Sequence, residues 1–190
     1  MAAMGAETGV ALPANLDAVF VCPLHEVPFI VTRERAKRLV TLLQDEFHVE
    51  TPEGVDRHLR LHVDDITQHL PYHVAPQVQH VSKLLSFAEE WGGKGAMVIH
   101  CWAGISRSTA AAFTSLCLVH PGVPETSIAR ALRRASPTAQ PNRLIVQLAD
   151  EAMGRKGRMV AALEEMGPAV RAGCGVPFSL RSDPDWLKGH

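Results

Sequence analysis

The sequence has few of the features that mark exported or membrane-spanning proteins. Only four of its 190 residues are cysteines, too few and too scattered for a disulfide scaffold in a chain of this size. No run of about eighteen consecutive apolar residues offers a candidate membrane span. The first twenty residues lack a basic start, and Glu7, Pro13 and Asp17 interrupt them, unlike a signal peptide. We therefore expect a cytoplasmic protein whose thiols stay reduced.

An excess of charge of one sign is also missing. The 19 lysines and arginines nearly balance the 20 aspartates and glutamates. Such a chain has no general attraction for polyanions, so we expect neither nucleic acid nor a membrane as a partner. Any affinity for an anion must come from a local arrangement of residues. With 46% hydrophobic residues, the chain can form one domain with a substantial core.

Segments typical of strands and of helices alternate along the chain. Strands are predicted at 17–22, 59–63 and 96–100, and helices at 32–47, 76–91, 108–119, 125–135 and 142–166, the last breaking near Gly154 or Gly157. This order predicts an α/β fold with helices flanking a mainly parallel central sheet. We expect a loose N-terminal segment at 1–15, one domain at 16–166 and an irregular C-terminal tail at 167–190.

The stretch from His100 to Ser108 carries the most specific chemical pattern. Cys101 and Arg107 stand six positions apart, between a predicted buried strand and a predicted helix. A tight turn there points successive backbone N–H groups into one cradle at the positive end of the helix. Gly104 lets the backbone approach closely, and the guanidinium of Arg107 can grip two phosphate oxygens. The cradle fits a phosphate dianion and favours the thiolate form of Cys101, a nucleophile that needs no separate base.

The other residues of this stretch have supporting roles in the same interpretation. The hydroxyl of Ser108 can donate to the sulfur of Cys101, and His100 can orient the loop through backbone carbonyls. Trp102 either forms a wall of the pocket or packs beneath it. Cysteine is often only a small buried hydrophobe, but its neighbours here favour a catalytic role. The predicted phosphate-binding loop consists of Trp102, Ala103, Gly104, Ile105, Ser106 and Arg107.

This pattern resembles the signature loop of the protein tyrosine phosphatase superfamily: His-Cys, five residues, Arg, then Ser or Thr. Gly104-Ile105-Ser106 is similar to the dual-specificity branch, as is Asn142 after Pro141, where that branch has an Asn near the loop. The likeness runs from about residue 15 to 166. It implies a dual-specificity/tyrosine phosphatase-like fold without a cofactor. The implied reaction is hydrolysis of phosphotyrosine, and of phosphoserine or phosphothreonine, in a protein or peptide, through a phosphocysteine intermediate.

The resemblance also implies an upstream aspartic acid that protonates the leaving group and then activates water. Asp64 and Asp65 both follow the predicted strand 59–63. We favour Asp65, because relative to Val63 it occupies the position that the branch usually gives its acid. Asp65 lies 36 residues before Cys101, slightly farther than is expected for the branch. An insertion in the loop at 68–76 could absorb this difference. Asp64 is interpreted as a strand-end or turn carboxylate.

Three other activities are alternatives at this point. A phosphatase of an inositol phosphate or another small phosphate ester commonly carries lysines within the loop, and none occurs between Trp102 and Ser106. A sulfur-transferring enzyme is not expected to combine Arg107 and Ser108 with an upstream acid. A phosphoresidue-binding module of the same fold typically lacks the nucleophile. The residues therefore favour a protein phosphatase.

Further residues have both a structural and a functional interpretation. Two histidine pairs with i,i+4 spacing lack a carboxylate or cysteine at ligand spacing, so we expect no metal site; they are His58/His62 and His69/His73. Cys22 is interpreted as a buried strand residue, with a protective disulfide to Cys101 as the alternative. A basic helix face is interpreted as solvated surface, or else as a guide for an acidic phosphopeptide; it comprises Arg130, Arg133 and Arg134.

Overall fold

The chain forms one five-stranded sheet in the order β3-β2-β4-β1-β5. The computed structural model describes residues 16–183 and 185, so the predicted loose segment 1–15 lies outside the described residues. The strands are β1 (Ala18–Pro23), β2 (Arg38–Leu43), β3 (Arg57–His62), β4 (Ala96–Cys101) and β5 (Phe178–Arg181). All neighbouring strands are parallel except β1 and β5. The prediction of a mainly parallel central sheet is confirmed.

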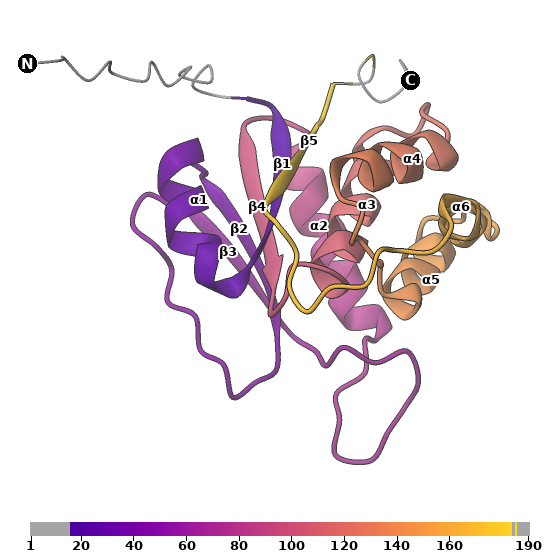
Figure 1. Ribbon diagram of the computed structural model, residues 1–190, viewed down its shortest axis with the longest axis horizontal. Coiled ribbons are helices and arrows are strands. Elements are labelled where there is room, and N and C mark those ends of the chain that lie inside the picture. The colour runs from indigo at the N-terminus through magenta and orange to yellow at the C-terminus, as the bar shows by residue number, and fades with distance from the viewer. Residues whose placement is uncertain (1–15, 184, 186–190) are drawn as a thin grey trace, which may run out of the picture.

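Helices cover both faces of this sheet (Figure 1). They are α1 (Val27–Glu34), α2 (Val78–Trp91), α3 (Arg107–Val119), α4 (Glu125–Ala135), α5 (Arg143–Ala152) and α6 (Arg158–Met166), with a short 3-10 helix, η1 (Leu24–Glu26). Helix α1 packs on one face, and the other helices gather on the opposite side. The predicted α/β architecture is therefore confirmed. None of the described helices has the length and apolar character needed to cross a bilayer.

The sheet separates two apolar clusters. Since successive residues of a strand point to opposite faces, β4 sends Ile99 and Cys101 to the larger cluster and Val98 to the smaller one beneath α1. Cys22 belongs to the smaller cluster, on the opposite face from Cys101. Burial, followed by the charges of Glu26 and Cys101, also raises the pKa of the Cys22 thiol to about 12. The interpretation of Cys22 as a buried strand residue fits this geometry, and the alternative disulfide does not.

The helix predicted at 32–47 is wrong. Helix α1 ends at Glu34, Arg35 takes a left-handed conformation with φ 50°, and β2 begins at Arg38. The residues from Leu39 to Leu43 are buried throughout, and they pack against both clusters. A parallel strand buried on both faces is apolar at almost every position, so it also satisfies a helical spacing.

The later helices agree closely with the prediction. Helix α4 has the predicted bounds, and the helix predicted at 142–166 is divided into α5 and α6. Gly154 and Gly157 lie in the break with φ of 63° and 83°, a conformation that glycine adopts without a steric penalty. The position of the break is therefore explained by these two glycines.

The prediction of an irregular tail after residue 166 is wrong at its centre. Residues 178–181 form β5, which pairs antiparallel with β1 and buries Leu180 completely. Beyond it, the Ser182 N–H donates to the Asp17 carbonyl at 2.8 Å. Residues 167–177, the C-terminal strap, run from α6 to β5 across the lower end of the sheet (Figure 1).

Candidate active site

Cys101 lies at the floor of a cleft of about 940 Å³ at the carboxyl end of the central strand β4. The residue is only 1% exposed. Cys101 is the last residue of β4 and Arg107 is the first residue of α3. The turn from Cys101 to Arg107 therefore connects a buried strand directly to a buried helix. The cleft is lined by this turn and by residues from the segments after β2 and β3, from the α4–α5 loop and from the strap. The predicted cysteine and arginine therefore share one concave site.

The backbone of the turn forms a cradle because its carbonyl groups are held outward. Four carbonyls accept a hydrogen bond from a backbone N–H outside the turn: Trp102 from Leu24 (3.2 Å), Ala103 from Gly175 (2.8 Å), Ile105 from Gln140 (2.9 Å) and Ser106 from Asn142 (3.2 Å). The described residues contain no cis peptide bond. In a planar trans peptide, the carbonyl and the next N–H point in opposite directions. The N–H groups of the residues that follow are therefore directed into the cleft.

Gly104 is the position where the cradle needs glycine. Its φ is +70°, in the left-handed region that other residues adopt at a cost. A Cβ atom there would lie 2.8 Å from the Pro23 nitrogen and 2.9 Å from the Cys22 carbonyl carbon. The turn therefore packs against the backbone at the end of β1, as the predicted close approach requires.

Ser108 lies beside the sulfur of Cys101, and Arg107 lines the same cleft. The Ser108 Oγ lies 3.2 Å from the Cys101 Sγ, and both side chains are buried. One Nη of Arg107 donates to the Val63 carbonyl at 2.8 Å, which fixes the guanidinium on the cleft wall. Its Nε is buried and makes no hydrogen bond within the described residues. The Val63 carbonyl thus holds one donor of the guanidinium, while the Nε donor has no acceptor among the described residues.

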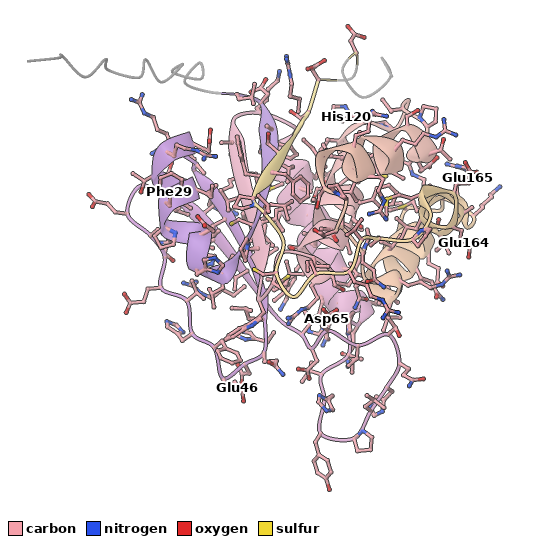
Figure 2. The ribbon with its side chains drawn as sticks, viewed as in Figure 1. Phe29, Glu46, Asp65, His120, Glu164 and Glu165 are labelled. Carbon is pink, nitrogen blue, oxygen red and sulfur yellow. The ribbon has the colours of Figure 1, made fainter. Side chains whose placement is uncertain are left out.

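Asp65 lies at the base of the long loop between β3 and α2 (Figure 2), and it lines the same cleft as Cys101. Its Oδ1 accepts hydrogen bonds from the Ser106 hydroxyl at 2.6 Å and from the Asn142 side-chain amide at 2.9 Å. Its Oδ2 lies 3.9 Å from the Arg107 Nε. The Asp65 side chain is 40% exposed. The structure thus brings together the predicted acid, the predicted supporting asparagine and the loop.

Asp64 has a different environment from its neighbour. It exchanges two hydrogen bonds with Val74, one through its backbone N–H (2.8 Å) and one through Oδ2 (2.7 Å). Burial raises the pKa of Asp64, but the bonds from the Val74 N–H and from the Gln44 and His73 side chains outweigh burial and hold the pKa below its usual value. Asp64 therefore closes the base of the long loop as a turn carboxylate.

His100 connects the cradle to the neighbouring strands on the face opposite Cys101. Its Nδ1 lies 3.4 Å from the Cys101 carbonyl, and its Nε2 lies 2.7 Å from the Thr41 Oγ1. The same hydroxyl lies 2.8 Å from the His58 Nε2. If the His100 Nδ1–H donates to the Cys101 carbonyl, the Thr41 hydroxyl can donate to the His100 Nε2. The same hydroxyl then accepts a hydrogen bond from the His58 Nε2–H. In this arrangement every group has a partner and both imidazole rings are neutral. Burial above all lowers the pKa of His100 to about 4, which keeps this ring neutral.

The sequence interpretation missed an aromatic wall and the strap. The rings of Phe47 and Trp102 lie 4.9 Å apart at a tilt of 55°, and both line the cleft. Phe47 was expected inside a helix, although it lies in the loop after β2. Trp102 is 54% exposed, so of its two predicted positions it forms the wall. Ala172 and Gly173 of the strap also line the cleft, and no side-chain pattern marks them.

The expected basic face on α4 is only partly present. Arg133 turns toward the protein and donates to four backbone carbonyls, those of Ser136, Pro137, Ala139 and Gly167. Arg130 lies 3.7 Å from Glu165. The predicted solvated face is thus wrong for Arg133, because the carbonyls of the α4–α5 loop surround its guanidinium. Among the described residues, no group of three histidine, cysteine, aspartate or glutamate side chains could hold a metal ion.

Comparisons with known proteins identify the fold. No family model matches the sequence, and no curated protein matches it by sequence. Human DUSP28 has 19% identity and a TM-score of 0.57 over 75% of this chain and 99% of its own. The phosphatase domain of Yvh1 from Chaetomium thermophilum has 16% identity and a TM-score of 0.56, and the match covers 77% of this chain and 99% of that domain. PTPMT1 in complex with PI(5)P has 21% identity and a TM-score of 0.54, and the match covers 74% of this chain and 95% of PTPMT1. The chain has the fold of these dual-specificity-phosphatase-like structures.

Proposed function

We propose that the chain is a cysteine-dependent phosphatase that hydrolyses phosphotyrosine, and phosphoserine or phosphothreonine, in protein substrates. The observation that carries this proposal is the arrangement in the cleft, where the Cys101 sulfur lies 3.2 Å from Ser108 Oγ and shares the cleft with Arg107 and Asp65. These groups supply a nucleophile, a cation for the phosphoryl oxygens and an acid for the leaving group. The shared fold adds support, because phosphatases have it.

In the first step, the Cys101 thiolate attacks phosphorus while the bond between phosphorus and the ester oxygen breaks. The inward N–H groups of the cradle and the guanidinium of Arg107 bind the phosphoryl oxygens as negative charge redistributes. Asp65, in its acid form, gives its proton to the departing oxygen, which leaves as an alcohol or phenol. A phosphocysteine remains on Cys101.

In the second step, water attacks the phosphorus of the phosphocysteine. The Asp65 carboxylate accepts a proton from this water, and the bond between sulfur and phosphorus breaks. The Ser108 hydroxyl, already 3.2 Å away, donates a hydrogen bond to the sulfur as it leaves as a thiolate. Inorganic phosphate is released and the starting state is restored.

The composition of the cleft favours a singly phosphorylated protein residue over a small polyphosphate. Among the described residues that line the cleft, the arginines are Arg107 and Arg143, and none is a lysine. Arg143 pairs with Glu164 at 2.8 Å. The Phe47–Trp102 wall offers apolar surface to a phenyl ring or a peptide side chain. A ligand with several phosphates would find few unpaired cations beyond Arg107.

The mechanism can be tested with p-nitrophenyl phosphate and purified protein in the presence of EDTA. We expect hydrolysis by the wild type, no turnover by Cys101→Ser, and binding of inorganic phosphate by that variant. Cys117→Ala is the matched control, since Cys117 is buried within α3, where burial raises the pKa of its thiol, and this variant should keep its activity. Turnover by Cys101→Ser would reject the mechanism.

The substrate class needs a second assay. Three peptides that differ only in carrying phosphotyrosine, phosphoserine or phosphothreonine should be compared with an inositol phosphate. We expect the peptides to be hydrolysed with the higher kcat/KM. A higher value for the inositol phosphate would reject the protein substrate but keep the phosphatase mechanism.

A further inference from the structure

The C-terminal strap is attached to the α4–α5 loop and to the cradle. The Gly167 carbonyl accepts from Arg133 at 3.0 Å, and the Val170 N–H donates to the Pro137 carbonyl at 2.9 Å. Farther along, the Gly175 N–H donates to the Ala103 carbonyl at 2.8 Å. The strap then continues into β5. It is therefore held at several points, and one of them is the cradle.

The bond from Gly175 fixes one peptide plane of the cradle. The Ala103 carbonyl and the Gly104 N–H belong to the same trans peptide and point in opposite directions. Because Gly175 holds the carbonyl outward, the Gly104 N–H is directed into the cleft, where it can donate to a phosphate oxygen. The other outward carbonyls of the cradle are held by the start of η1 and by the α4–α5 loop.

Glycine at position 175 allows the strap to lie directly against the cradle. A Cβ atom there would lie 3.0 Å from the Gly104 oxygen and 3.3 Å from the Ala103 oxygen, closer than side chains usually approach such atoms. Gly175 is buried, and both contacts are to backbone atoms that cannot rotate away. Any side chain must therefore push the strap and the cradle apart.

The strap also contributes to the walls of the cleft. Ala172 and Gly173 line it together with Cys101 and Arg107. Strap and cradle thus line the same cleft. We propose that the C-terminal strap is part of the active site, with Gly175 as a positioning residue that orients the Gly104 N–H toward the substrate phosphate. This inference rests on the proposed phosphatase function of the same cleft.

A matched pair of glycine substitutions tests this role in the full chain. Gly175→Ala inserts a methyl group between the strap and the cradle. Gly122→Ala is the control, since a Cβ at Gly122, between α3 and α4, meets no atom within 4 Å. Inorganic phosphate binding is measured by calorimetry, together with kcat and KM for p-nitrophenyl phosphate and the thermal midpoint Tm.

We expect Gly175→Ala to bind phosphate about tenfold more weakly, the effect of losing one aligned hydrogen bond to a charged group. Its kcat/KM should fall by at least as much, and Gly122→Ala should match the wild type. A lower Tm with unchanged phosphate affinity would show that the strap only stabilises the fold and would overturn the inference. If the wild type binds phosphate but does not turn over p-nitrophenyl phosphate, the proposed phosphatase activity is refuted. The phosphate affinity of Gly175→Ala would still decide the role of the strap.

A backbone substitution separates the hydrogen bond from the steric effect. Gly173 and Cys174 form a suitable junction for chemical ligation, so residues 174–190 can be synthesised with glycolic acid in place of Gly175. This change replaces the N–H donor by an ester oxygen and adds no side chain at position 175. The refolded ester chain should bind phosphate several-fold more weakly than the same semisynthetic chain with glycine. Equal affinities would overturn the role of the Gly175 N–H.

Discussion

The buried imidazole of His100 makes the stability of the fold depend on pH. Burial, the largest cause, lowers the pKa of His100 from 6.5 to about 4; the hydrogen bond with the Cys101 backbone opposes this, and the charge of Arg107 adds to it. Between these two values the unfolded chain binds a proton that the folded chain excludes. The stability that the neutral His100 ring contributes is therefore fully present above about pH 6.5. This contribution is lost as the pH falls toward about 4.

The size of this effect follows from the two pKa values. Their difference corresponds to about 3 kcal/mol when the titration is complete, of which about 2 kcal/mol is lost between pH 7 and pH 5. His58, whose pKa burial and the charge of Arg60 also lower to about 4, adds less because its side chain is partly exposed.

Urea unfolding at pH 7 and pH 5 measures this loss directly. Wild type should lose about 2 kcal/mol or slightly more. His100→Gln retains a partner for Thr41 without a titrating ring, so its stability should change much less between the two pH values. His69→Gln, which removes an exposed histidine, should behave like the wild type. A pH dependence of His100→Gln equal to that of the wild type would refute the reasoning.

Four further substitutions test other contacts of the site and of the loop beside it. Gly104→Ala should lower the free energy of unfolding by more than about 2 kcal/mol and weaken phosphate binding, because its Cβ would lie 2.8 Å from the Pro23 nitrogen; urea unfolding and phosphate titration that match the wild type would contradict this. Asp65→Asn should lower kcat about 100-fold or more, with a larger loss for an alkyl phosphate than for p-nitrophenyl phosphate, since a poorer leaving group depends more on its proton. Asp64→Asn should affect stability more than kcat, and the reverse ranking of the two variants would transfer the acid role. Arg133→Met should cost about 2–4 kcal/mol in urea unfolding, because four carbonyls lose their charged donor; a stability equal to that of the wild type would show that these bonds are not formed.

The cradle could be predicted from the sequence because its determinants are close together in the chain. Cys101, Gly104 and Arg107 act through the conformation and charge of a single turn, so their types and spacing carry the information. Asp65 and Asn142 come from distant segments, and the sequence indicated them through a resemblance. The structure places both within hydrogen-bond distance of each other.

The errors have a common physical origin in contacts that leave no side-chain pattern. Strand β2 is buried on both faces, so its uniform apolar run could not be distinguished from a helix. The strap contacts the cradle through the backbone N–H of Gly175, which any residue except proline also carries. Arg133 looks like a surface arginine until the α4–α5 loop folds around it. Such contacts depend on tertiary arrangement, which local periodicity does not encode.

The most direct test of the central claim is to trap the phosphorylated enzyme. Wild type and Asp65→Asn are mixed with p-nitrophenyl phosphate, quenched within the first turnover and digested for mass spectrometry. The mechanism predicts one phosphoryl group on the peptide that contains Cys101, and none on that peptide in Cys101→Ser. Turnover without any adduct, or an adduct on another residue, would contradict nucleophilic attack by Cys101.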